Sequence, residues 1–163
     1  MNFRIGFGYD VHRLAQGLPF TLGGIVIPHT KGSVGHSDGD TLIHAICDAL
    51  LGAANMRDIG YHFPDTSNEY KGIDSKILLK RTIELIASKG YAIGNIDSTI
   101  ALQQPKIKDY IPTMQAVLSN TCGIELDAIA IKATTTEKLG FEGREEGVSA
   151  SAVVLIYKKD AIG

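Results

Sequence analysis

The sequence predicts a two-layer α+β fold: a four-stranded mixed sheet with helices on one face and a small hairpin beside it. Apolar residues alternate with polar residues or glycine from Phe3 to Tyr9, which indicates a first strand that ends near Asp10. Two further strands, rich in Ile, Val and Ala, are predicted at 129–134 and 148–157. Because only a short connection separates these two, we expect them to pair antiparallel.

Capping and turn signals predict the other elements. Ser37 and Asp40 match a Ser-x-x-acid capping pattern, and the helix that follows is expected to run to about Ala54. The segment immediately before Ser37 is expected to be a loop. The remaining predicted elements are a hairpin at 19–28, a functional loop at 55–72, a helix at 74–89, a strand at 95–103 and a helix at 112–123.

Composition indicates one globular domain, expected to span residues 1–163, with 44% hydrophobic and 21% charged residues. The formal net charge of -2 argues against nucleic-acid or membrane partners, so local donors or metals would have to hold an anionic substrate. The two cysteines, Cys47 and Cys122, imply no disulfide framework, and no signal-peptide pattern opens the chain. We therefore expect a cytoplasmic protein.

The first candidate site is a metal centre. Asp10 and His12 stand two residues apart at a strand end, so their side chains leave from the same face. With His44 on the first predicted helix, they supply two imidazoles and a carboxylate, the usual three ligands of catalytic zinc with a fourth position open. Asp40 or Asp48, each one turn away, could orient the free nitrogen of His44. On spacing alone, His29, His36 or His62 could equally be the third ligand.

Two further segments carry groups that can bind phosphate. The loop Gly35–Asp40 places two glycines, His36 and Ser37 before a helix, where unpaired backbone amides attract anions. An ordinary capping loop has the same composition. At 132–141, three consecutive threonines leave a strand beside Glu137, which could hold a divalent cation on a diphosphate. A plain strand end with a solvated turn explains the same residues.

Together these segments closely resemble the 2-C-methyl-D-erythritol 2,4-cyclodiphosphate synthase family. The likeness extends along essentially the whole chain, in order and at the expected separations, and the metal and phosphate positions show no departure. The matching blocks are Gly8–His12, His36–Asp40 continuing to His44, Asp58–Gly60, Phe63–Thr66, Lys132–Phe141 and Gly143–Arg144.

The resemblance implies roles for individual residues. The implied catalytic and metal residues are Asp10, His12 and His44 on one Zn²⁺ per subunit, His36 and Thr135 as transition-state stabilisers, and Glu137 on a Mg²⁺ or Mn²⁺ ion at the substrate diphosphate. The implied substrate contacts are Ser37, Asp58, Ile59, Gly60, Phe63, Pro64, Asp65, Thr66 and Ser67 near the sugar, Leu102, Gln103, Gln104, Pro105, Lys106, Ile107, Lys108, Thr134 and Thr136 near cytidine, and Phe141 and Arg144 near a central cavity.

The family resemblance also implies a homotrimer with active sites between subunits. In the implied reaction, of the non-mevalonate isoprenoid pathway, the 2-phosphate of a cytidine-diphosphate-linked methylerythritol attacks the β-phosphorus and expels CMP. Because the nucleophile is already an anion, no strong general base is needed. The alternatives are a metal-dependent phosphohydrolase and a non-catalytic trimer that binds metal and nucleotide.

Overall fold

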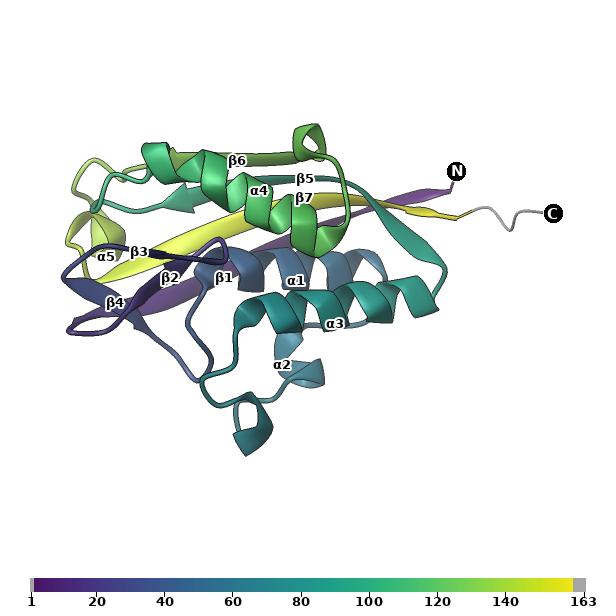
Figure 1. Ribbon diagram of the computed structural model, residues 1–163, viewed down its shortest axis with the longest axis horizontal. Helices are drawn as coiled ribbons and strands as arrows, with labels where there is room; N and C mark the ends of the chain where they lie inside the picture. The colour runs from purple at the N-terminus through teal and green to yellow at the C-terminus, as the bar shows by residue number, and fades with distance from the viewer. Residues whose placement is uncertain (1, 160–163) are drawn as a thin grey trace.

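The computed structural model describes residues 2–159 and contains two β-sheets (Figure 1). The main sheet has five strands in the order β4-β1-β7-β5-β6, and β2 and β3 form a separate two-stranded sheet. The predicted α+β class is confirmed, but the prediction of four strands is wrong. The strands are β1 (Phe3–Gln16), β2 (Phe20–Leu22), β3 (Ile25–Ile27), β4 (Lys31–Val34), β5 (Tyr91–Ala101), β6 (Ile129–Thr134) and β7 (Gly147–Lys158). The helices are α1 (Thr41–Ala53), α2 (Ile59–His62), α3 (Ser75–Ser88), α4 (Ile111–Cys122) and α5 (Gly140–Gly143).

The fifth strand is β4, which lies in the segment expected to be a loop. β1 continues past Asp10 to Gln16, and its last residues pair antiparallel with β4, from Arg13 opposite Val34 to Gln16 opposite Lys31. Four residues that include a glycine are too short to show a periodic pattern. Pairing with the far end of β1, rather than local sequence, makes this segment a strand.

The last two strands do not pair with each other, which corrects the expected antiparallel pair. β5 lies between them, parallel to β6 and antiparallel to β7. β7 instead occupies the centre of the sheet, hydrogen-bonded to β1 on one side and β5 on the other. The segment between β6 and β7 contains α5 and crosses over β5, so neighbours in sequence are not neighbours in the sheet.

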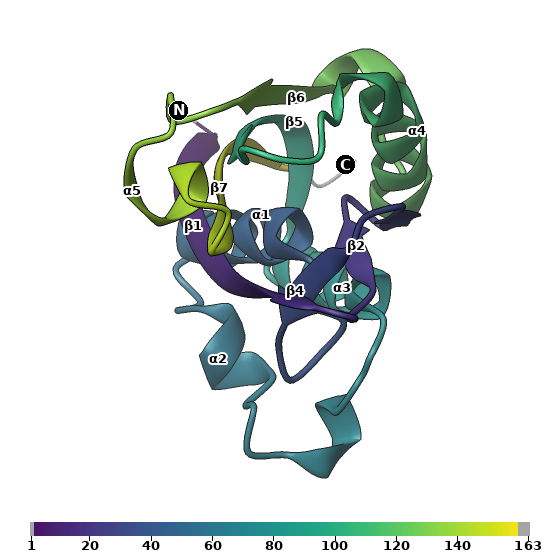
Figure 2. The ribbon, with the colours of Figure 1, turned by 90° about the vertical axis from the view of Figure 1, so that its left-hand side faces the viewer.

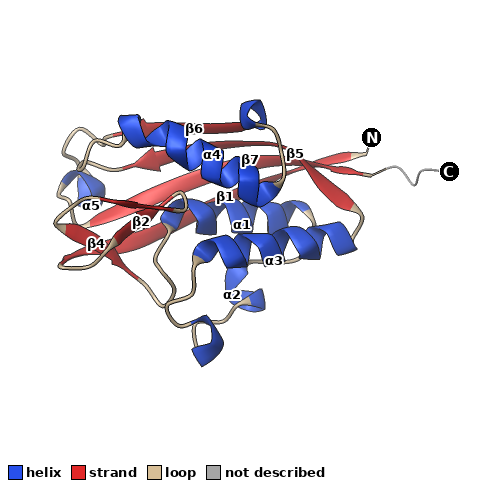
Figure 3. Ribbon diagram, in the orientation of Figure 1, coloured by secondary structure: helices blue, strands red, loops and turns tan. Residues whose placement is uncertain are grey.

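The three long helices, α1, α3 and α4, lie together on one face of the main sheet (Figures 2 and 3). α1 packs on β1 and β7 on one side and on α3 on another, and its fully buried apolar residues include Leu42, Ile43, Ile46 and Leu50. The expectation of helices on one face is therefore confirmed for the long helices.

Within residues 2–159, none of the helices has both the length and the apolarity that a bilayer-spanning helix requires.

Several predicted boundaries are confirmed. Asp74 caps α3, which ends just before Gly90, a residue with φ of 81°. Pro112 lies in the first turn of α4, and Gly123 ends that helix in the left-handed conformation. The hairpin turn consists of Gly23 and Gly24, both with positive φ, as a two-residue turn between β2 and β3 needs.

α1 begins one residue after Asp40, not at a cap formed by Ser37. The Asp40 carboxylate accepts hydrogen bonds from the amides of Ile43 in α1 (3.0 Å), Gly23 (3.0 Å) and Gly24 (2.7 Å). These three bonds make a fully buried carboxylate tolerable, although burial still raises the pKa of Asp40. The same side chain therefore starts α1 and ties the hairpin to it.

Two glycines let α1 approach β1 unusually closely. A Cβ on Gly8 would lie 1.9 Å from the Ala45 carbonyl oxygen, and one on Gly6 would lie 1.9 Å from that of Ala49. Both glycines are on the inward face of β1, the face that also carries Asp10. Backbone contact at these positions sets the distance between the strand and the helix.

We expect Gly8→Ala to lower the free energy of unfolding by about 1–3 kcal/mol or more, because the new methyl group must displace the α1 backbone. Gly52→Ala is the matched control, since a Cβ on Gly52, inside α1, would meet no atom within 4 Å. That control should stabilise the protein by about 0.5–1 kcal/mol through helix propensity. Urea denaturation at one fixed protein concentration measures both. Equal unfolding midpoints for the two variants would contradict the proposed contact.

Candidate active site

The predicted metal ligands come together between β1 and α1. Asp10 and His12 project from the inward face of β1, and His44 reaches them from α1. The Nδ1 atoms of His12 and His44 lie 2.9 Å and 3.3 Å from Asp10 Oδ2. Gly35 leaves room for the His12 ring, since a Cβ there would lie 3.1 Å from two atoms of the ring. Two imidazoles and one carboxylate therefore meet at one point.

The chemistry of this cluster fits a divalent cation such as zinc. One ligand atom from each of the three residues lies within 4.8 Å of the others. Asp10 Oδ2 is buried and receives no well-directed hydrogen bond from the described residues, although both imidazoles are close to it. Burial raises the pKa of Asp10, but His12 and His44 outweigh that effect and leave the pKa below its usual value. A bound cation would supply the partner that this oxygen lacks.

The other candidates for the third ligand make different contacts. His36 Nε2 lies 2.9 Å from the Ser67 carbonyl oxygen, and His62 Nε2 lies 2.7 Å from that of Met56. His29 packs near the Phe20 ring, away from the cluster. Among the described residues, the geometry therefore favours His44.

The His44 nitrogen that faces away from the cluster contacts two hydroxyl groups. Its Nε2 lies 2.9 Å from Ser75 Oγ and 3.1 Å from Ser37 Oγ. Neither Asp40 nor Asp48 orients this nitrogen, so that expectation is wrong; backbone amides already occupy their carboxylates. Ser75 is not among the site residues predicted from the sequence, because it lies 31 residues from His44 and no local spacing connects the two.

Asp48 positions the predicted sugar-binding loop next to the metal cluster. Its Oδ1 accepts a hydrogen bond of 2.8 Å from the backbone amide of Ile59, and Asp58 caps the short helix α2. This segment closes a cavity of about 310 Å³ over the cluster. Of the predicted site residues, the cavity is lined by Asp10, His12, His36, Ser37, His44, Ile59, Gly60, Phe63 and Asp65, together with Val11, Tyr70 and Leu78. Asp58, Pro64, Thr66 and Ser67 belong to the same loop without lining the cavity.

The predicted cytidine-binding residues form a second cavity of about 450 Å³ at the ends of β5 and β6. The predicted residues that line it are Leu102, Pro105, Lys106, Ile107, Lys108, Thr134 and Thr135. Gln103, Gln104, Thr136 and Glu137 lie beside it; the Glu137 amide donates to Thr135 Oγ1 at 3.3 Å. The two cavities share no lining residue, so one chain does not bring His36 and Thr135 together.

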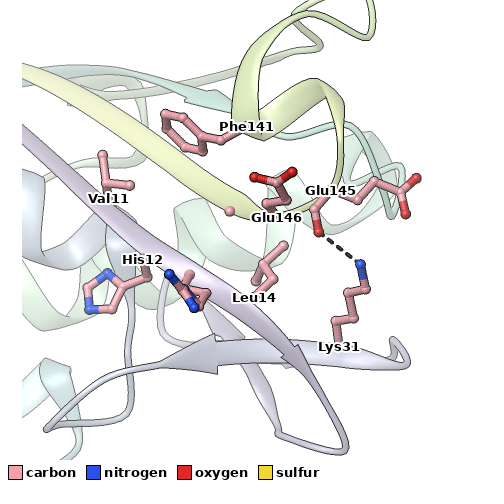
Figure 4. Close-up of a pocket in the computed structure, with 9 residues that line it drawn as sticks. Val11, His12, Leu14, Lys31, Phe141, Glu145 and Glu146 are labelled. Atoms are coloured by element: carbon pink, nitrogen blue, oxygen red, sulfur yellow. Dashed lines mark hydrogen bonds between the residues drawn. The ribbon is translucent and has the colours of Figure 1, made fainter.

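A third cavity, of about 480 Å³, lies between β1 and the segment that follows α5 (Figure 4). Phe141 lines it, together with Lys31, whose Nζ donates to the Glu145 carbonyl oxygen at 2.9 Å. Arg144, predicted beside Phe141, does not line this cavity; its Nε is 2.7 Å from Glu146 Oε1 in an exposed ion pair. Of the three metal-cluster residues, this cavity reaches His12 alone.

The fold and the site define an α+β enzyme with a candidate metal centre beneath a small-molecule cavity. Residues 3–157 match the sequence profile of the YgbB family, and the chain belongs to that family. It is 67% identical to a protein of Bacteroides fragilis named 2-C-methyl-D-erythritol 2,4-cyclodiphosphate synthase, over 97% of this chain and 99% of that protein.

Two solved structures carry the same fold. A CDP-bound form of 2C-methyl-D-erythritol-2,4-cyclodiphosphate synthase superposes with a TM-score of 0.87 at 36% identity, covering 94% of this chain and 99% of that one. A CDP complex of IspF from Plasmodium falciparum superposes with a TM-score of 0.85 at 34% identity and 98% coverage of both chains. The family resemblance inferred from the sequence is thereby confirmed.

We expect zinc affinity to fall as the pH falls, because a ligating imidazole must first lose its proton. Burial lowers the pKa of His44, but the Asp10 carboxylate outweighs that effect and raises the pKa above 6.5. The loss of affinity should therefore begin above pH 6.5 and approach about tenfold per pH unit for each protonated ligand. Competition with a chromophoric chelator, corrected for the chelator's own protonation, measures this dependence. An affinity that stays constant from neutral to acidic pH would contradict the imidazole ligands.

Proposed function

We propose that this protein converts 4-diphosphocytidyl-2-C-methyl-D-erythritol 2-phosphate to 2-C-methyl-D-erythritol 2,4-cyclodiphosphate and CMP, as a cytoplasmic lyase of the non-mevalonate isoprenoid pathway. The observation that carries this proposal is the cluster of Asp10, His12 and His44 under a cavity that five predicted substrate residues and His36 line. Family membership and near-complete coverage by relatives with that name support the same reaction. We propose that residues 1–163 form one domain.

The proposed metals differ in their ligands. Asp10, His12 and His44 would hold zinc through two nitrogens and one oxygen. When bound, zinc would act as a Lewis acid on the reacting phosphoryl group. Glu137, in an exposed turn after β6, would contribute one carboxylate to a magnesium or manganese ion whose other ligands are phosphate oxygens.

The side chains of this chain contribute position and charge stabilisation. The substrate's 2-phosphate is already anionic, so the site needs no strong base to create the nucleophile. His36 and Thr135 would donate hydrogen bonds to the phosphoryl oxygens where negative charge accumulates. The loop after α1 would hold the erythritol, and the cavity at the ends of β5 and β6 would hold the cytidine.

The separation of the two cavities supports a homotrimer with active sites between subunits. His36 lines one cavity and Thr135 the other, so a complete site needs the second cavity of a neighbouring chain. The outward face of the sheet supports the same assembly, because it exposes a continuous apolar stripe. The stripe consists of Phe3, Ile5, Phe7, Tyr9 and Val11 on β1 and Val153 and Tyr157 on β7, each between 41% and 71% exposed. A patch of this kind marks a protein–protein interface more often than a free surface.

Turnover of the cytidine-linked substrate with zinc and magnesium tests the reaction directly. We expect one CMP per substrate and a cyclic product with two coupled diphosphate signals in phosphorus NMR. Inorganic phosphate and a linear product would instead identify a phosphohydrolase. Stoichiometric binding of substrate without release of CMP would identify a non-catalytic binding protein, and either result would overturn the proposal.

Phe7→Glu should dissociate the trimer, because it places a charge in the middle of the apolar stripe, opposite Val153 on β7. Val26→Glu is the matched control: Val26 is 66% exposed, close to the 64% of Phe7, but lies on the separate hairpin. Analytical ultracentrifugation should give monomers for the first variant and trimers for the second. A trimeric Phe7→Glu variant would refute this interface.

A further inference from the structure

His44 presents one nitrogen to the metal cluster and the other to a partly buried chain of hydrogen-bonded side chains. Its Nδ1 faces Asp10, while its Nε2 lies 2.9 Å from the hydroxyl oxygen of Ser75. Ser75 is the first residue of α3 and is fully buried. The ring is therefore held between β1 on one side and α3 on the other.

The Ser75 hydroxyl also contacts the Asp38 carboxylate, and this contact determines which atoms donate and which accept along the hydrogen-bond chain from Asp38 to His44. Ser75 Oγ donates to Asp38 Oδ1, because an ionised carboxylate can only accept. The single hydroxyl proton is then used, so Ser75 can only accept from His44. A neutral His44 must then carry its proton on Nε2, which leaves Nδ1 bare and directed at the cluster.

Asp38 is itself held in place by backbone bonds. Its carboxylate accepts from the amides of Ser75 (2.9 Å) and Asp40 (3.1 Å), and its own amide donates to the Ile73 carbonyl oxygen (3.1 Å). The carboxylate therefore joins the loop before α1 to the start of α3. Because both ends are anchored, the position of the Ser75 hydroxyl follows from the fold.

Ser37 is the other hydroxyl near His44 Nε2, but its surroundings differ. It lies slightly farther away, at 3.1 Å, and accepts a long 3.4 Å bond from the Gly39 amide. Unlike Ser75, it lines the cavity over the cluster, and within residues 2–159 it donates no hydrogen bond to a carboxylate. Ser37 is thus free to turn toward a ligand in the cavity, whereas buried Ser75 is not.

We propose that Asp38 and Ser75 are positioning residues: through the chain Asp38–Ser75–His44 they select the His44 tautomer and hold its Nδ1 toward the metal. This inference rests on the proposed zinc site, because it assigns a function to residues that support one of the zinc ligands. Neither side chain lines the cavity over the cluster, so neither is expected to contact the substrate. Outer partners of this kind affect metal affinity and ligand orientation more than substrate binding.

Ser75→Ala removes one hydroxyl at a helix start, where alanine is well tolerated. We expect the zinc dissociation constant to rise about 10–100-fold and kcat to fall, with KM for the substrate nearly unchanged. Ser98→Ala is the matched control, since Ser98 is also a buried serine but donates to the Ala130 carbonyl oxygen in the sheet. Wild-type zinc affinity in Ser75→Ala, or an equal loss in Ser98→Ala, would overturn the proposal.

A double-mutant cycle separates positioning from general support of the fold. If Asp38 acts on zinc through Ser75, then Asp38→Asn should weaken zinc binding in the wild type but add almost nothing in the Ser75→Ala background. Its effect on unfolding should persist in both backgrounds, because Asp38 also accepts from backbone amides. If the losses of zinc affinity in Asp38→Asn and Ser75→Ala were additive in the double variant, the proposed hydrogen-bond chain from Asp38 through Ser75 to His44 would be excluded.

The tautomer supplies a readout that needs neither metal nor turnover. In the metal-free protein at alkaline pH, long-range proton–nitrogen NMR should show His44 protonated on Nε2, and Ser75→Ala should give a mixture of tautomers. An unchanged Nε2 tautomer in that variant would contradict the proposed role of Ser75.

The variant His44→Ala distinguishes failure of this inference from failure of the proposed function. Full zinc binding by His44→Ala would refute the zinc site itself. Loss of zinc from His44→Ala together with full zinc affinity in Ser75→Ala would refute the positioning chain alone.

Discussion

The close contact between α1 and β1 is the constraint on which the candidate site depends. Gly6 and Gly8 allow the carbonyl oxygens of α1 to approach the strand where any side chain would overlap them. This contact brings His44 within reach of Asp10, although the two come from different elements. The packing of α1 on β1 therefore also sets the geometry of the metal cluster, because a displacement of α1 from β1 would move His44 away from Asp10 and His12.

One buried and two partly buried carboxylates organise the loops around α1. Asp38, Asp40 and Asp48 each accept backbone amide hydrogen bonds from another segment: the start of α3, the hairpin and the α2 loop, respectively. Removing a carboxylate from water is costly, most of all for the fully buried Asp40, and amide donors offset that cost while binding two segments together. The polar residues near the cluster thus determine where the cavity walls lie, in addition to any contact they make with a ligand.

β1 has two faces with different roles. Its inward face carries the glycines that contact α1 and, farther along, Asp10 and His12. Its outward face carries the alternating apolar residues of the exposed stripe. In the proposed trimer, the strand that supplies two metal ligands would also form the subunit interface, so that assembly and catalysis would depend on the same alternation. The separate cytidine cavity at the ends of β5 and β6 is compatible with this arrangement.

Local patterns were enough to predict α3, α4, the hairpin and β6, since each depends on caps, turns or periodicity within a few residues. The residue types of the metal cluster were also readable, because Asp10 and His12 share one strand face. β4, the central place of β7 and the Ser75 partner of His44 depend on contacts between segments far apart in the chain. No local signal encodes such contacts, since they form only when hydrogen-bonding groups left unpaired by one segment meet those of another.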